Sequence, residues 1–78
     1  MISIKNMNDL SRFPQLYEAV KKTTTSFRIK MNSLVLIDAD VDRCGAELYF
    51  MAGDNHLDIS INSNGEITDT YYDGEDEC

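Results

Sequence analysis

The sequence contains no tryptophan, one proline, one histidine and two cysteines among its 78 residues. Two cysteines, Cys44 and Cys78, are too few for a disulfide framework and show no C-x-x-C spacing, so we expect reduced thiols in a cytoplasmic protein. Nowhere do 18 apolar residues follow one another, and the first residues, MISIKNMND, lack the apolar run of a signal sequence. We therefore expect a protein that neither spans a membrane nor carries a signal peptide.

Positive charge is scarce in the second part of the chain. Residues 1–30 hold six Lys or Arg and two carboxylates, a net charge of +4, whereas residues 31–78 hold twelve carboxylates against Arg43 alone, a net charge of −11. The whole chain has a net charge of −7 and a pI of about 4.3. Nucleic acid and anionic membranes both require positive charge from a protein, so we expect direct binding to neither. Any partner is expected to be neutral or basic.

The length of 78 residues fits one domain, which is too small for a large substrate cleft. Hydrophobic residues make up 42% of the chain, an ordinary value for a folded protein. The last six residues, DGEDEC, are acidic and contain no large apolar side chain. We therefore predict one compact domain over residues 1–72 and a disordered acidic tail over residues 73–78.

Near the start of the chain, apolar side chains recur every three or four residues, which is the spacing of one helix face. They are Met7, Leu10, Phe13, Leu16, Tyr17 and Val20. Pro14 is tolerated in the first turn of a helix but not in its interior, so we predict a turn or short helical segment over residues 8–12 and the main helix over 14–23. The three threonines 23–25 are β-branched and are expected to end this helix.

From residue 26 onward the apolar period changes to two, which indicates strands. Turn-forming segments, DRCG, GDN and NSNG, separate the apolar runs. The predicted strands cover residues 26–32, 33–41, 46–52, 56–62 and 66–72. Strands this closely spaced pair in antiparallel order, because parallel pairs need a long crossover. The predicted fold class is α+β, with one N-terminal helix packed on an antiparallel β-meander of four or five strands.

Alternation within the strands divides their side chains between a face toward the helix and a solvent face. The predicted core consists of Leu16, Tyr17, Val20, Phe27, Ile29, Val35, Ile37, Leu48, Phe50, Leu57, Ile59, Ile61 and Ile67. The predicted solvent face consists of Arg28, Lys30, Leu34, Leu36, Asp38, Asp40, Glu47, Tyr49, Met51, His56, Asp58, Glu66, Thr68 and Thr70. Carboxylates from three strands thus form one negative surface, interrupted by a tyrosine and a methionine.

The last hairpin has two alternative registers. A two-residue turn would point one isoleucine away from the core, whereas a type I turn over residues 62–65 with a left-handed Gly65 places Ile61 opposite Ile67. We predict the second register, which also places Leu57 opposite Tyr71. Tyr71 is then expected to complete the core.

The segment LIDADVDRCG places three aspartates at alternate positions and raises the alternative of a calcium loop. Asp38, Asp40 and Asp42 match positions 1, 3 and 5 of the EF-hand pattern, but the required glycine is replaced by Arg43 and the required glutamate by Tyr49. Alternate carboxylates along a strand also lie about 6.6 Å apart and do not converge on an ion. We therefore predict neither a metal site nor a cofactor.

The sequence does not predict an enzyme. Cys44 and His56 are conceivable as a nucleophile pair, but nothing in the sequence specifies an orienting third group or an oxyanion hole. There is no P-loop, no dinucleotide-binding glycine motif and no zinc spacing. Catalytic carboxylates for glycoside chemistry would require a cleft that a chain of this length rarely provides.

The carboxylate-rich face instead suggests recognition of a basic protein surface, in which carboxylates steer association and an aromatic side chain supplies a desolvated contact. The predicted partner-binding residues are Asp38, Asp40, Asp42, Glu47, Tyr49, Asp58, Tyr72, Asp73, Glu75 and Asp76. In size and charge the chain is similar to phage inhibitors of host defence enzymes and to immunity proteins of nuclease toxins. That likeness is one of class and assigns no residue roles. Together with the acidic face, it suggests an inhibitor of a nucleic-acid-binding protein. We expect the chain to be a monomer or a homodimer.

Two alternatives stay open. The acidic face can serve only to keep the protein in solution. The protein can also be a structural or regulatory subunit that pairs through a sheet edge, with itself or with a partner strand.

Overall fold

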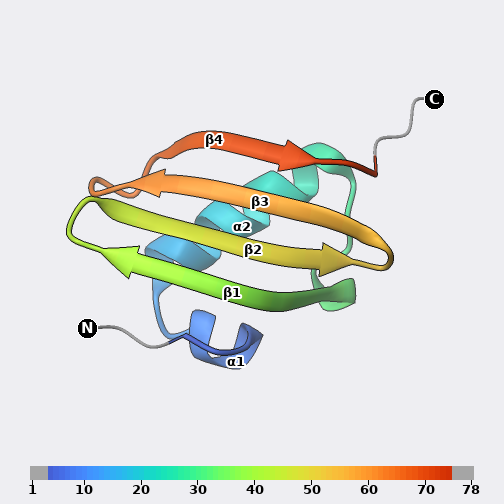
Figure 1. The fold of residues 1–78 in the computed structure, drawn as a ribbon, viewed down its shortest axis with the longest axis horizontal. Helices are drawn as coiled ribbons and strands as arrows, with labels where there is room; N and C mark the ends of the chain where they lie inside the picture. Colours follow the sequence, from blue (N-terminus) through green and yellow to red (C-terminus); the bar gives the residue numbers. More distant parts are fainter. Residues whose placement is uncertain (1–3, 75–78) are drawn as a thin grey trace.

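The computed structural model describes residues 4–74 and shows an α+β fold with two layers, a helix on a four-stranded antiparallel sheet (Figure 1). Its elements are α1 (Met7–Leu10), α2 (Pro14–Phe27), the short 3-10 helix η1 (Met31–Ser33), β1 (Leu34–Asp42), β2 (Gly45–Ala52), β3 (Asn55–Asn62) and β4 (Ile67–Tyr72). This confirms the predicted class and the four-strand version of the meander. Among the described residues, no helix is long and apolar enough to cross a membrane.

Helix α2 begins at Pro14 as predicted but continues four residues beyond the predicted end. The three threonines do not end it, because their hydroxyls find acceptors within the helix. Thr23 donates to the carbonyl of Ala19 at 2.9 Å, and Thr25 donates to that of Lys21 at 2.9 Å. Thr23 and Thr24 are also buried, so packing against the rest of the fold outweighs their low helix propensity.

The predicted strand over residues 26–32 does not exist, because the end of α2, its termination and the start of η1 occupy these positions. Arg28 adopts the left-handed conformation with φ of 63°, and the amide of Ile29 donates to the carbonyl of Thr24 at 2.8 Å. This is the Schellman arrangement, formed here without the usual glycine. Ile29 and Met31 still pack against the core. The alternation of apolar and polar residues in this segment therefore reflects burial in the connection between α2 and β1 and not a strand.

The strands follow one another in the order β1-β2-β3-β4, and every neighbouring pair is antiparallel. Figure 1 shows α2 running behind the sheet and α1 lying beside the β1 edge. The buried side chains of the sheet alternate with exposed ones, most regularly in β2 and β3. The hydrophobic core comprises Ile4, Leu10, Ala19, Val20, Leu34, Leu36, Ala46, Leu48, Phe50, Ala52, Leu57, Ile59 and Ile61.

Strand β1 begins in the opposite phase to the predicted one. Leu34 and Leu36 face the core, whereas Val35 and Ile37 are 63% and 57% exposed. A bulge follows, in which Leu36 pairs with Phe50 and Asp38 pairs with Tyr49. The additional residue, Ile37, reverses the phase, so that the aspartates point outward as predicted even though the first half of the strand was assigned to the wrong faces.

The last hairpin confirms the predicted pairing of Ile61 with Ile67 and the left-handed Gly65, whose φ is 84°. A second irregularity between Ser60 and Ile61 then shifts the register. Leu57 therefore lies opposite Tyr72 and not opposite Tyr71. The predicted core position of Tyr71 is wrong, and this side chain is 56% exposed.

Candidate functional site

The candidate site is the side of the sheet that faces away from α2, which we call the outer face. Each strand contributes the side chains that alternate with its core residues, and no described helix covers this side in Figure 1. The outer face consists of Val35, Ile37, Asp38, Asp40, Asp42, Glu47, Tyr49, Met51, His56, Asp58, Ser60, Asp69 and Tyr71.

Strand pairing arranges these side chains in rows that cross the sheet. One row holds the partly apolar set Val35, Met51 and His56; the middle row holds Asp38, Tyr49, Asp58 and Tyr71; the third row holds Asp40, Glu47, Ser60 and Asp69. Successive rows are two residues apart along each strand, which is about 7 Å, and neighbours within a row stand about 5 Å apart. Carboxylates therefore gather toward the β1–β2 turn, and apolar side chains gather toward the opposite end.

No lysine or arginine occurs in any of the four strands. Asp40 and Glu47 pair directly across β1 and β2, and both are exposed. Like charges placed opposite each other destabilise a sheet, and nothing of the opposite sign within the strands relieves this pair. The basic side chains of the first thirty residues lie instead in the helical layer and its connections, for example Lys21 and Lys22 on α2. The charge separation seen along the sequence thus becomes a separation between layers.

Tyr49 lies in the middle of the outer face and is tied to the carboxylates around it. Its hydroxyl donates to Oε1 of Glu47 at 2.6 Å. This hydrogen bond, with partial desolvation and the negative charges of Glu47, Asp58 and Asp40, raises the pKa of Tyr49 to about 12. The hydroxyl thus stays protonated to a higher pH than that of an ordinary tyrosine, and the ring presents an aromatic surface within a negative field.

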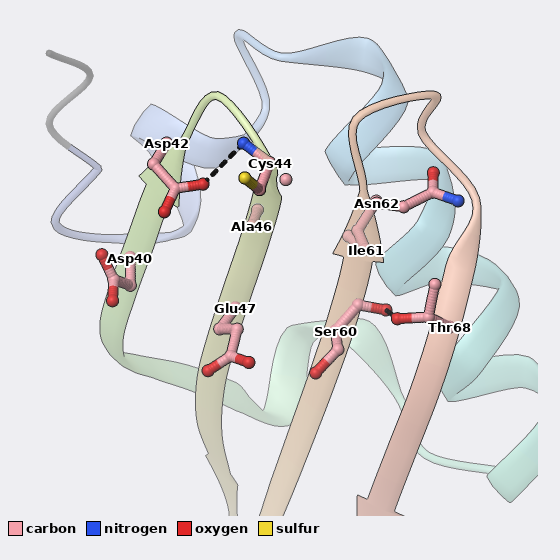
Figure 2. A pocket seen from close by; sticks show the side chains of 10 residues that line it. Asp40, Asp42, Cys44, Ala46, Glu47, Ser60, Ile61, Asn62 and Thr68 are labelled. Atoms are coloured by element: carbon pink, nitrogen blue, oxygen red, sulfur yellow. Dashed lines mark hydrogen bonds between the residues drawn. The ribbon is translucent and has the colours of Figure 1, made fainter.

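A hollow of about 410 Å³ opens at the end of the outer face near the β1–β2 turn (Figure 2). Figure 2 shows Asp40, Glu47, Ser60 and Thr68 beside it on the four strands, below Asp42 and Cys44. The lining is Asp40, Asp42, Cys44, Gly45, Ala46, Glu47, Ser60, Ile61, Asn62 and Thr68. The hollow thus continues the acidic surface rather than forming an enclosed substrate cleft.

Cys44 is an exposed free thiol at the rim of this hollow. Its backbone N–H donates to Oδ1 of Asp42 at 2.8 Å, which fixes the turn. Cys44 and His56 lie near opposite ends of β2 and β3, because Gly45 pairs with Asn62 whereas Met51 pairs with His56. Six residues of extended strand span about 20 Å, so the two side chains do not form a nucleophile pair.

His56 instead contacts Asp73. The carboxylate of Asp73 accepts from the backbone N–H of His56 at 2.8 Å, and its other oxygen lies 3.4 Å from Nδ1 of the ring. The amide of Asp73 donates back to the carbonyl of His56 at 3.2 Å. The hydrogen bond from the His56 amide is the main reason that the pKa of Asp73 lies below its ordinary value. These contacts extend the pairing of β3 and β4 by one position.

The structure brings together five of the predicted partner-binding residues, namely Asp38, Asp40, Glu47, Tyr49 and Asp58. Asp42 lies beside them at the hollow, whereas Asp73 lies at the other end of the sheet with His56. Tyr72 points to the helix side, where its ring centroid is 5.3 Å from that of Phe27. Glu75 and Asp76 lie outside the described residues.

Sequence reasoning missed Asp69 and Tyr71 as members of the outer face. It placed Glu66, Thr68 and Thr70 there instead. The irregularity between Ser60 and Ile61 moves Thr70 opposite Ile59 on the inner side and brings Asp69 and Tyr71 to the outer side, whereas Thr68 still lines the hollow. A signal for this shift was present in the sequence, because only the shifted register leaves Asp69 facing solvent. The exposed pair at the start of β1, Val35 and Ile37, was missed because Leu34 and Leu36 fit the core equally well.

Among residues 4–74, no group of three or more His, Cys, Asp or Glu side chains is arranged to hold a metal ion. Comparison of the chain with protein-family models, with curated proteins and with solved structures gave no match. The geometry of the outer face is therefore the basis for any functional assignment.

Proposed function

We propose that this protein binds another protein through its outer face and covers a basic surface of that partner, of the kind that contacts nucleic acid. The observation that carries the proposal is the composition of this face. Carboxylates from all four strands lie on one side of the sheet, and no lysine or arginine lies in any of the strands. Such a surface attracts Arg-rich or Lys-rich partners and speeds their association.

The arrangement of the charges supports this proposal. The carboxylates of Asp40 and Glu47 are held opposite each other by the β1–β2 pairing, and Asp38 and Asp58 flank Tyr49 in the next row. This geometry costs stability in the free protein, whereas a basic partner would neutralise the repulsion on binding. Regularly spaced negative charge on a rigid sheet also resembles the charge that a nucleic-acid backbone presents to its binding proteins. The resulting activity is stoichiometric inhibition rather than catalysis.

The test uses two double variants with equal loss of charge. Asp40→Asn with Glu47→Gln neutralises the outer face, and Glu18→Gln with Asp54→Asn neutralises two exposed carboxylates outside it. Tagged protein is used to capture partners from a cell lysate at about 0.1 M and about 0.5 M salt, because screening weakens contacts between exposed charges. Captured proteins are identified by mass spectrometry, and added double-stranded DNA serves as competitor.

We expect a basic, nucleic-acid-binding protein to be captured at low salt by the native chain and by the Glu18/Asp54 variant, and lost with the Asp40/Glu47 variant. Added DNA is expected to displace it. Capture of the same proteins by both variants, or capture that DNA leaves unchanged, would contradict the proposal.

A second candidate is association through a sheet edge, and the exposed start of β1 favours it. Within the described chain, β1 pairs only with β2, so its other edge has no strand beside it, and the exposed apolar side chains of Val35 and Ile37 lie near that edge on the outer face. The bulge at Ile37 works against this candidate, because it interrupts the regular pairing that an added strand would need. Sedimentation at the same two salt concentrations separates the candidates, since a strand-paired dimer persists at about 0.5 M.

A further inference from the structure

The outer face is divided along the direction of its strands. At one end, Val35 pairs with Met51 and Ile37 bulges beside them; we call these three residues the apolar corner. At the other end lies the row that contains Asp40, Glu47 and Asp69, which we call the acidic row. The two parts share one continuous surface, and the row with Tyr49 and Tyr71 lies between them.

The apolar corner is accessible and is formed by neighbours rather than by scattered residues. Val35 and Ile37 are 63% and 57% exposed, and Val35 pairs with Met51 on the neighbouring strand. Single exposed apolar side chains are common, whereas contiguous groups of them rimmed by polar residues are typical of interaction sites. A partner that only supplied positive charge would leave this group in water.

The negative charge of the outer face limits which partners can bind to it. The chain's own residues 75–77 are all acidic, so they do not complement the acidic row. The outer face of a second copy carries the same carboxylates and would be repelled face to face. Complementarity instead requires a partner that brings cations to the acidic row and apolar side chains to the corner.

We infer that the outer face binds a protein segment in which apolar side chains and a cluster of Arg or Lys lie about 14 Å apart, the distance of four strand residues from Met51 to Glu47. This inference rests on the proposed function and names the partner's chemistry. The apolar residues contact Val35, Ile37 and Met51. The cations pair with the acidic row, and Tyr49 lies beneath the middle of the segment.

Two synthetic helical peptides test the inference. The first places a leucine cluster about nine residues from an arginine cluster, because a helix rises 1.5 Å per residue and nine residues span about 14 Å. The second is identical except that each leucine is replaced by glutamine, which keeps the charge and the helix propensity. Binding of both to the full chain is measured by fluorescence anisotropy at about 0.1 M salt.

We expect the leucine peptide to bind roughly tenfold more tightly than the glutamine peptide, which corresponds to about 1.4 kcal/mol. Val35→Thr with Ile37→Thr keeps the β-branched shape and should remove this advantage while leaving the glutamine peptide unaffected. Asp40→Asn with Glu47→Gln should weaken both peptides. Glu18→Gln with Asp54→Asn should change neither.

The outcomes separate this inference from the proposed function. Equal affinity of the two peptides for the native chain overturns the inference and leaves the proposed function intact, because the basic peptide still binds. Absence of binding by both peptides overturns both. The inference is also overturned if the leucine peptide still binds more tightly than the glutamine peptide in the Val35/Ile37 variant, because the apolar corner would then make no contact with the leucines. It is likewise overturned if the protein alone forms a salt-sensitive oligomer that blocks the peptides, because a second copy would then cover the corner.

Discussion

The two faces of the sheet are built from the same four strands but meet different surroundings. The inner face is closed by α2, and its central residues Leu48 and Ile59 are almost completely inaccessible. The outer face has no described element over it and combines carboxylates with exposed apolar side chains. The inner face can be understood from stability alone, since burial of apolar area favours folding. The outer face repels itself and exposes apolar surface, so stability alone does not account for its composition, and this supports the proposed binding function.

Two single-residue deletions in β1 give the largest expected contrast between the faces. Deletion of Ile37 removes the bulge and leaves Leu36 inside and Asp38 outside, so the free energy of unfolding should change by about 1 kcal/mol or less. Deletion of Ala39 forces Asp38 or Asp40 onto the partly buried inner row beside Leu48, and the loss of hydration of an unpaired carboxylate there should cost about 3–5 kcal/mol.

Urea denaturation followed by circular dichroism measures both deletions. Circular dichroism in the absence of urea shows whether the Ala39 deletion folds at all. Similar stability of the two variants would contradict the assignment of Ile37 as the phase-changing residue of β1.

Much of the fold could be predicted from the sequence because most of its signals agreed. The start of α2 was marked by Pro14 and a helical period, and the strands β2 and β3 by strict alternation between turn segments. The end of α2 could not be predicted, since threonine hydroxyls that donate to helix carbonyls and a left-handed arginine leave no propensity signal. Tertiary packing determines the helical conformation of those residues.

The candidate site was predictable in its centre and not at its margins. Asp40, Glu47 and Asp58 follow from alternation in strands whose phase is fixed by large buried neighbours. Val35 and Tyr71 depend on a bulge or a register shift, and in both cases the alternative phase buries an equally apolar side chain. A pattern of period two does not reveal where one residue is added.

Truncation of one aromatic residue on each face gives the second contrast. Phe50 is 1% exposed and packs in the core, so Phe50→Ala should lower the free energy of unfolding by about 3–5 kcal/mol. Tyr71 is 56% exposed, so Tyr71→Ala should cost less than about 1 kcal/mol. Both are measured by urea denaturation. A large loss for Tyr71→Ala would show that the outer face contributes to folding and would weaken its assignment to binding.

Neutralisation of the acidic row should produce a smaller effect of opposite sign. Asp40→Asn with Glu47→Gln removes two like charges that face each other, and the amide oxygen introduced at position 47 still accepts from the Tyr49 hydroxyl, so the free energy of unfolding should rise by roughly 0.5 kcal/mol at low salt. The gain should diminish at about 0.5 M salt, where the repulsion is already screened. Glu18→Gln with Asp54→Asn is the control and should leave stability unchanged. A loss of stability in the Asp40/Glu47 variant would mean that the row is structural.

The smallest effect is confined to the ionisation of Tyr49. Its pKa of about 12 comes first from the hydrogen bond to Glu47 and then from desolvation and the surrounding carboxylates. Because this pKa lies above the unfolded value of about 10, the stabilising effect is fully present below pH 10 and is lost as the pH rises through 12. Glu47→Gln removes the charged acceptor, so the pKa should fall toward 10. Tyrosinate absorbance of the native chain minus that of Tyr49→Phe isolates this titration, and a native value near 10 would show that the ring is not held among the outer-face carboxylates.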